Sequence, residues 1–191
     1  ARLGAAVVQA LTRSPEAEAL PARIVVGQSA PVLPTDPLPT PAAAQAALGE
    51  ARAELETAQA DKNANRIFWA RRKLRHAEAL VELLQVDRPQ VGVPLPIAVA
   101  GIGDLALVGA PCEVFVELGL AVRTGSPFAR TAVLGYTNGY MGYLPTAAAF
   151  AEGGYEVGAR IVQNGLAIAP AAEDAFVAAS LAALQEAAAG G

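Results

Sequence analysis

The chain has 191 residues, of which 53% are hydrophobic and 17% are charged, and its formal net charge is −4. This composition is typical of a folded domain, and the mildly acidic charge gives no reason to expect nucleic acid as a partner. The single cysteine, Cys112, excludes an internal disulfide, and the absence of a run of about 18 apolar residues argues against a transmembrane segment.

The first forty residues predict a helix, a short strand and a connector. Residues 1–13 carry apolar side chains at helical spacing, and residues 22–29 have the composition of a strand. Residues 31–41 contain five prolines and predict an extended connector without regular structure. Because the chain begins with alanine inside a helical pattern, we expect it to be a piece of a longer protein. Its start at residue 1 would then result from a processing cut or from truncation.

Residues 41–87 predict an antiparallel hairpin of two helices. Apolar residues recur at spacings of three and four on both sides of a polar break at 61–65, as in coiled-coil packing. Basic and acidic residues nearly balance in this segment, so we interpret them as a solvated outer face. His76, the only histidine, lies off the apolar stripe and is predicted to be at the surface.

The remainder of the chain alternates strands and helices. Residues 91–108 predict a β-hairpin whose second strand, 105–108, is buried. A helix is expected to begin at Glu113 and to end at Ser126-Pro127, followed by a strand over residues 129–136 and a C-terminal amphipathic helix over residues 172–188. We therefore predict an α/β (or α+β) fold, with a mixed sheet flanked by helices and an inserted antiparallel helical hairpin, as part of a larger catalytic domain.

Two segments hold the residues that could carry chemistry. Glu113 follows a buried strand, where open α/β folds place ligands, although it could equally be an ordinary glutamate at a helix start. Residues 136–156 combine tyrosines with glycines, so that hydroxyl groups and a closely approaching backbone occur together. Tyr143 and Tyr155 could return their rings to one pocket or could simply pack. Cys112 is predicted to be a buried filler, Asn138 to serve a turn and Tyr140 to pack.

These segments resemble a known family. Residues 105–119, 126–128, 138–146 and 153–156 resemble the neutral/alkaline non-lysosomal ceramidase superfamily, most closely its smaller bacterial members without the C-terminal immunoglobulin-like domain. In that family a Pro-Gly-Glu turn supplies a glutamate zinc ligand, and a Tyr-x-x-Tyr motif supplies a tyrosine ligand. A Tyr-Glu pair twelve residues later contributes to the substrate pocket. The resemblance implies that Glu113 and Tyr143 are zinc ligands and that Tyr155 polarises the scissile carbonyl.

The resemblance also implies an incomplete enzyme. The family's two histidine ligands and nucleophilic serine lie upstream of the region that residues 1–13 match. Residues 1–191 would then be the C-terminal portion of a catalytic domain containing the inserted hairpin 41–87. They would share zinc with the N-terminal half of the same enzyme, present as a separate chain or a further segment.

We expect a zinc-dependent amidohydrolase-like enzyme that acts on linear amides, with a small-molecule or lipid-like amide as substrate, and no activity in this chain alone. A soluble bacterial protein, cytoplasmic or secreted, would fit this resemblance. The alternative is a non-catalytic interaction module in which the helical hairpin 41–86 is the working surface and the tyrosine loop only packs.

Overall fold

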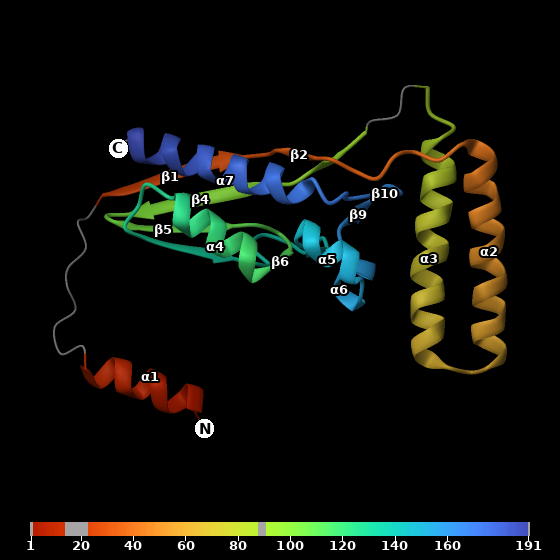
Figure 1. Ribbon diagram of the computed structural model, residues 1–191, viewed down its shortest axis with the longest axis horizontal. Helices are drawn as coiled ribbons and strands as arrows, with labels where there is room; N and C mark the ends of the chain where they lie inside the picture. The colour runs from red at the N-terminus through yellow and green to blue at the C-terminus, as the bar shows by residue number, and fades with distance from the viewer. Residues whose placement is uncertain (1, 14–22, 88–90, 191) are drawn as a thin grey trace.

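A computed structural model describes residues 2–13, 23–87 and 91–190 of the chain. Its centre is a four-stranded sheet (Figure 1), with β1 (Ile24–Ser29), β4 (Ile97–Ile102), β5 (Leu105–Gly109) and β7 (Arg130–Leu134) in this order. The β1–β4 and β4–β5 pairs are antiparallel, whereas β5 and β7 run parallel. This arrangement confirms the predicted mixed sheet, and β4 and β5 confirm the predicted β-hairpin.

Two helices pack against the sheet and against each other. α4 (Val116–Gly125) provides the crossover that the parallel β5–β7 pair needs, and α7 (Ala172–Ala189) lies along β1 and β4 (Figure 1). Side chains alternate between buried and partly buried along β4, as expected for a strand with one face against the core. Phe176 and Leu184 of α7 are fully buried and face this core.

Shorter elements complete the body. The described residues include three pairs of two-residue strands: β2 (Val32–Leu33) with β3 (Val93–Pro94), β6 (Glu113–Val114) with β8 (Tyr143–Leu144), and β9 (Val162–Gln163) with β10 (Leu166–Ala167). Two short helices, α5 (Ala147–Glu152) and α6 (Tyr155–Gly158), follow β8. β2 falls inside the proline-rich segment that was expected to lack regular structure. Within the described residues, no helix combines the length and apolar character that a membrane span requires.

The helix predicted to begin at Glu113 begins three residues later, at Val116. Glu113 and Val114 instead form β6, which pairs in parallel with β8. The backbone N–H of Glu113 donates to Gly142 O at 2.9 Å, and that of Phe115 donates to Leu144 O at 3.1 Å. The expectation of a helix-start glutamate is therefore wrong, because the pairing with a strand thirty residues later holds this backbone extended.

The predicted helical hairpin is confirmed. α2 (Pro41–Ala60) and α3 (Ala64–Leu83) run side by side (Figure 1), and each begins at a polar residue, Thr40 or Asn63, whose side chain accepts a backbone N–H. Small and aliphatic residues are buried between the helices at the predicted spacings: Ala44, Leu48, Ala51, Ala58, Ala70 and Ala77. α1 (Arg2–Arg13) also confirms the predicted N-terminal helix.

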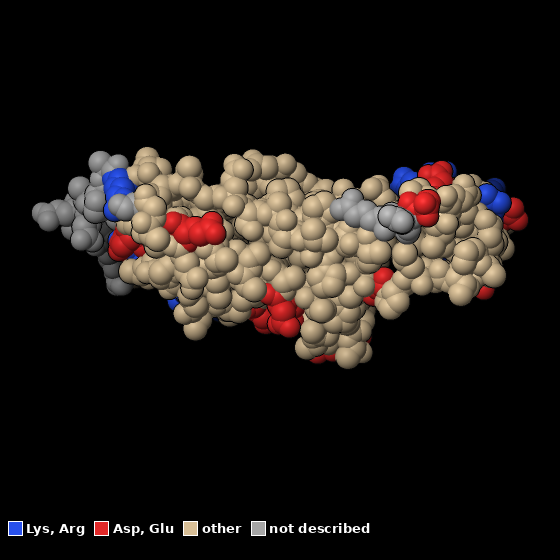
Figure 2. Space-filling view, turned by 90° about the horizontal axis from the view of Figure 1, so that it is seen from above, with Lys and Arg blue, Asp and Glu red and all other residues tan. Residues whose placement is uncertain are grey.

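A second face of α3 contacts the body of the protein. His76 Nε2 lies 3.0 Å from Gly165 O, and Arg72 Nη2 donates to Arg160 O at 3.2 Å. His76 is therefore half-buried, and the prediction of a surface histidine is wrong. The prediction that the charges of residues 41–87 form only a solvated face is wrong for Arg72 as well. Figure 2 shows many of the basic and acidic side chains at the hairpin end, with a largely uncharged surface over the middle of the molecule.

The contact between α3 and the turn after β9 depends on Gly165. Its φ is +78°, and a Cβ at this position would lie 2.5 Å from Leu80 N and 2.6 Å from Leu80 Cα. We expect Gly165→Ala to lower the free energy of unfolding by about 3 kcal/mol, because left-handed strain adds to a backbone clash. Denaturant unfolding followed by circular dichroism measures this loss.

Gly153→Ala is a matched control for this substitution. Gly153 has a similar φ of +73°, but nothing lies within 4 Å of a Cβ at its position. Only the strain should remain, at a cost of about 1 kcal/mol. Equal losses in the two variants would show that the backbone of α3 is not held close to Gly165.

Candidate active site

The β6–β8 pair places Glu113 directly opposite Tyr143. Paired residues of neighbouring strands project their side chains to the same face, so the carboxylate and the phenol lie together. β8 is also held from its other side, where Tyr143 N donates to Ala159 O at 3.2 Å and Ile161 N donates to Tyr143 O at 2.9 Å. Gly142 permits this crowding, since its φ is +117° and a Cβ would lie 2.8 Å from Ala159 O.

Two more tyrosines surround the Glu113 carboxylate. Tyr140 Oη donates to Glu113 Oε1 at 3.1 Å, and the ring of Tyr136 stacks on that of Tyr140 with centroids 5.4 Å apart. Tyr140 was predicted only to pack, so its hydrogen bond to Glu113 corrects that interpretation. Asn138, in the turn between these tyrosines, has a φ of 60°, which confirms its predicted left-handed conformation.

Tyr155 lies beside Tyr143 at the start of α6. The two rings meet edge to face with centroids 5.9 Å apart, so the chain does bring Tyr143 and Tyr155 together. Trp69 of α3 makes a second edge-to-face contact with Tyr155, at 5.2 Å. Tyr155 remains 57% exposed despite these two contacts.

Hydrogen bonds favour one charge state of this cluster. Desolvation alone would raise the pKa of the Glu113 carboxyl, but hydrogen bonding by Tyr136, Tyr143 and Tyr140 outweighs it and lowers the pKa. The same bonds favour the protonated phenols: the hydrogen bond to Glu113 raises the pKa of Tyr136 to about 12 and raises that of Tyr143 well above its ordinary value. At neutral pH the cluster therefore combines one carboxylate with neutral hydroxyl groups.

Glu113 and Tyr143 offer two oxygen atoms to a cation, and carboxylate oxygen is a usual ligand of zinc. The described residues contain no group of three or more His, Cys, Asp and Glu side chains that could hold a metal ion. His76 is engaged with Gly165 O on α3. The donor set thus fits part of a tetrahedral zinc site, which needs four ligands in all.

Cys112 precedes the site but lies in the core. Its side chain is fully buried, as predicted, and burial, followed by the charge of Glu113, raises the pKa of the thiol from 9.0 to about 12. We expect this thiol to react with Ellman's reagent at about pH 8 at least 100-fold more slowly in the native chain than in the unfolded chain. A comparably fast reaction in the native chain would contradict this burial.

The raised thiol pKa also predicts a pH dependence of stability. The contribution of Cys112 to the free energy of unfolding is complete below pH 9.0 and is lost as the pH rises toward 12. Cys112→Ala removes the titrating group, so a comparison of the two proteins over this interval isolates its contribution.

Sequence reasoning missed three aromatic residues of the site. Tyr136 and Tyr140 reach Glu113 because the turn between them is left-handed, and the turn predicted at Asn138 was the signal from which this contact could have been inferred. Trp69 reaches Tyr155 from a helix 86 residues earlier in the chain. No local pattern indicates that contact.

The fold and site together are those of a mixed α/β domain that presents a carboxylate–tyrosine cluster at a short parallel strand pair. No family model and no curated protein matches the chain. Among solved structures, the chain is similar to a ceramidase complexed with C2, at 28% identity and a TM-score of 0.41, over 49% of this chain and 15% of that one.

A second similar structure is the neutral ceramidase from Pseudomonas aeruginosa, at 30% identity and a TM-score of 0.36, over 49% of this chain and 16% of that one. Neutral ceramidases are thus among the structures that this chain resembles, as the sequence motifs predicted. The chain spans about one sixth of the length of these proteins. At these TM-scores the likeness does not define an activity, which must rest on the residues of the site.

Proposed function

We propose that this chain is the C-terminal part of a zinc-dependent hydrolase of linear amides that resembles neutral ceramidases. The observation that carries the proposal is the register of β6 and β8, which sets Glu113 opposite Tyr143. Tyr155 is in edge-to-face contact with Tyr143. These are the three residues to which the sequence motifs of the family assign the metal and the substrate carbonyl.

In this proposal Glu113 and Tyr143 hold the zinc ion. When bound, zinc supplies an activated water molecule and polarises the scissile carbonyl. Glu113 is suited to this task because a carboxylate carries the negative charge that a cation attracts, and the hydrogen bonds that lower its pKa further favour this ionised form. Tyr140 orients that carboxylate through the hydrogen bond between Tyr140 Oη and Glu113 Oε1.

Tyr155 has a different role in the proposal. The residue is exposed, and a phenol hydroxyl can donate a hydrogen bond to the oxygen on which negative charge develops during attack at an amide carbonyl. The edge-to-face contacts with Tyr143 and Trp69 fix the plane of the ring. The donor would therefore be preorganised before the substrate binds.

The remaining ligands would come from histidines in the N-terminal half of the enzyme. Metal content tests this division: we expect the 191-residue chain alone to bind zinc weakly and to hydrolyse no N-acyl amide. The longer protein, or the complex with its N-terminal half, should carry zinc and should release fatty acid from N-dodecanoylethanolamine. Tight stoichiometric zinc binding by the 191-residue chain alone would overturn the proposal, because two ligands rarely suffice.

A further inference from the structure

The helix α3 carries two contact faces. Ala70, Leu74 and Ala77 follow one another at helical spacing and pack within the hairpin. Trp69, Arg72 and His76 follow one another on a second face and meet the segment from Gly158 to Ala167. Through this second face, which forms one wall of a cavity, the hairpin contacts the body of the protein.

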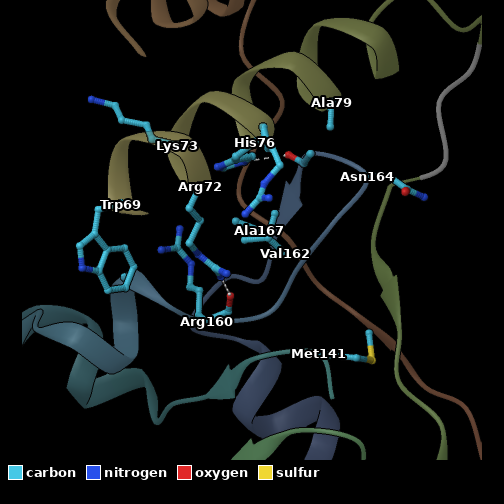
Figure 3. A pocket seen from close by; sticks show the side chains of 13 residues that line it. Trp69, Arg72, Lys73, His76, Ala79, Met141, Arg160, Val162, Asn164 and Ala167 are labelled. Carbon is cyan, nitrogen blue, oxygen red and sulfur yellow. Dashed lines mark hydrogen bonds between the residues drawn. The ribbon is translucent and has the colours of Figure 1, made fainter. Parts of the chain in front are cut away.

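A cavity of about 370 Å³ lies between this wall and the segment 158–167. Its size is within the range of small-molecule sites. Among the described residues, four basic side chains line it and no aspartate or glutamate does: Arg72, Lys73, Arg75 and Arg160. Figure 3 shows Arg72 reaching from α3 toward Arg160, while Lys73 points away from both. The lining is thus strongly basic in a chain whose overall charge is negative.

Only part of this positive charge is neutralised. Lys73 pairs with Glu54 of α2 at 2.7 Å, and Arg160 pairs with Asp36 at 2.7 Å. Arg160 is further held by the carbonyl oxygens of Ile168 and Val157, so its guanidinium has a structural task. Within residues 2–13, 23–87 and 91–190, neither Arg72 nor Arg75 forms a salt bridge. Arg72 donates one of its five guanidinium N–H groups to Arg160 O.

The basic cavity adjoins the tyrosine cluster. Trp69, which lines the cavity, is the residue in edge-to-face contact with Tyr155. Desolvation and Glu113 raise the pKa of the Tyr140 hydroxyl. Arg72 lies close enough to Tyr140 for its positive charge to oppose this rise. A molecule whose amide lies at Tyr155 could therefore extend past Trp69 into the cavity.

We propose that this cavity binds an anionic group, namely a carboxylate, sulfate or phosphate, with Arg72 as its main ligand and Arg75 as the second. Guanidinium groups suit this role because their parallel donors match the two oxygens of such groups. We further assign the anion to the substrate, so that the enzyme acts on acidic amides such as N-acyl amino acids. This second step rests on the proposed function, whereas the anion site itself does not.

Trp69 provides a direct test of the anion site, because it is the only tryptophan of the chain and lines the cavity. The fluorescence of the 191-residue chain is followed during titration with N-acetylglycine, inorganic phosphate and neutral N-acetylglycinamide at constant ionic strength. We expect saturable changes with the two anions and none with the amide. A response to N-acetylglycinamide equal to that for N-acetylglycine would overturn the anion site.

Substitutions distinguish a specific contribution of Arg72 to anion binding from a general effect of positive charge on α3. Arg72→Gln should weaken the binding of N-acetylglycine by at least about 10-fold, and Arg75→Gln should weaken it by a smaller factor. Arg71 is exposed and does not line the cavity, so Arg71→Gln should change the affinity for N-acetylglycine by no more than about twofold. Circular dichroism verifies that each variant is folded. Equal losses in the Arg71 and Arg72 variants, or no loss in either cavity variant, would contradict the assignment.

Hydrolysis by the longer protein distinguishes a substrate anion from a free one. The ratio of kcat/KM for N-dodecanoylglycine to that for N-dodecanoylethanolamine should exceed one and should fall at least about 10-fold in Arg72→Gln, with no change in Arg71→Gln. A ratio near one that Arg72→Gln leaves unchanged would overturn the substrate assignment and leave a site for free anions. Anion binding without hydrolysis of either amide would instead overturn the proposed function alone.

Discussion

Glu113→Gln in the longer, zinc-loaded protein is expected to lower zinc affinity by at least about 100-fold and to reduce amide hydrolysis accordingly. The substitution keeps the shape of the side chain but removes the charge that a cation requires. Because Glu113 lies in the exposed tyrosine cluster and not in the core, the free energy of unfolding should change by less than about 0.5 kcal/mol. Metal analysis after dialysis and a fatty-acid release assay measure the two losses.

Glu117→Gln is the matched control, since Glu117 lies in the first turn of α4, is exposed and does not reach the tyrosine cluster. It should leave zinc content and hydrolysis unchanged. If Glu113→Gln also left both unchanged, the catalytic proposal would fail. The alternative, a non-catalytic interaction module that uses the helical hairpin 41–86, would then be favoured.

Tyr155→Phe is expected to reduce kcat for amide hydrolysis by about 100- to 1,000-fold while zinc content stays the same. The substitution removes a hydroxyl that would donate to the developing oxyanion, and it retains the ring that contacts Tyr143 and Trp69. Steady-state kinetics and metal analysis of the same preparation test both parts. An unchanged kcat would show that Tyr155 only packs.

Tyr140→Phe provides a contrast to Tyr155→Phe. Tyr140 donates to the Glu113 carboxylate, so losing its hydroxyl should weaken zinc binding by about 10-fold and leave kcat of the zinc-saturated enzyme nearly unchanged. Removal of the Tyr155 hydroxyl would then lower kcat, whereas removal of the Tyr140 hydroxyl would lower zinc affinity. If both variants lost kcat equally at full zinc occupancy, the separate roles assigned to the two tyrosines would be wrong.

The helical hairpin was predictable because it depends on local periodicity. Apolar residues at spacings of three and four, with Thr40 and Asn63 at the helix starts, are sufficient to specify both helices and the face that each packs against the other. The same reasoning failed at Glu113. The apolar spacing of the following helix continues back to this residue, but a hydrogen bond to Gly142 O makes it part of a strand.

The sequence alone determined the secondary structure of most of the chain and the short list of residues able to carry chemistry, because both depend on residue type and near spacing. Only the tertiary structure decided that Tyr140 reaches Glu113, that Trp69 touches Tyr155 and that Arg72 lines a basic cavity. These contacts require the β6–β8 pairing and the packing of α3 on the body. Both join segments at least thirty residues apart, and hydrophobic periodicity contains no information about which distant segments meet.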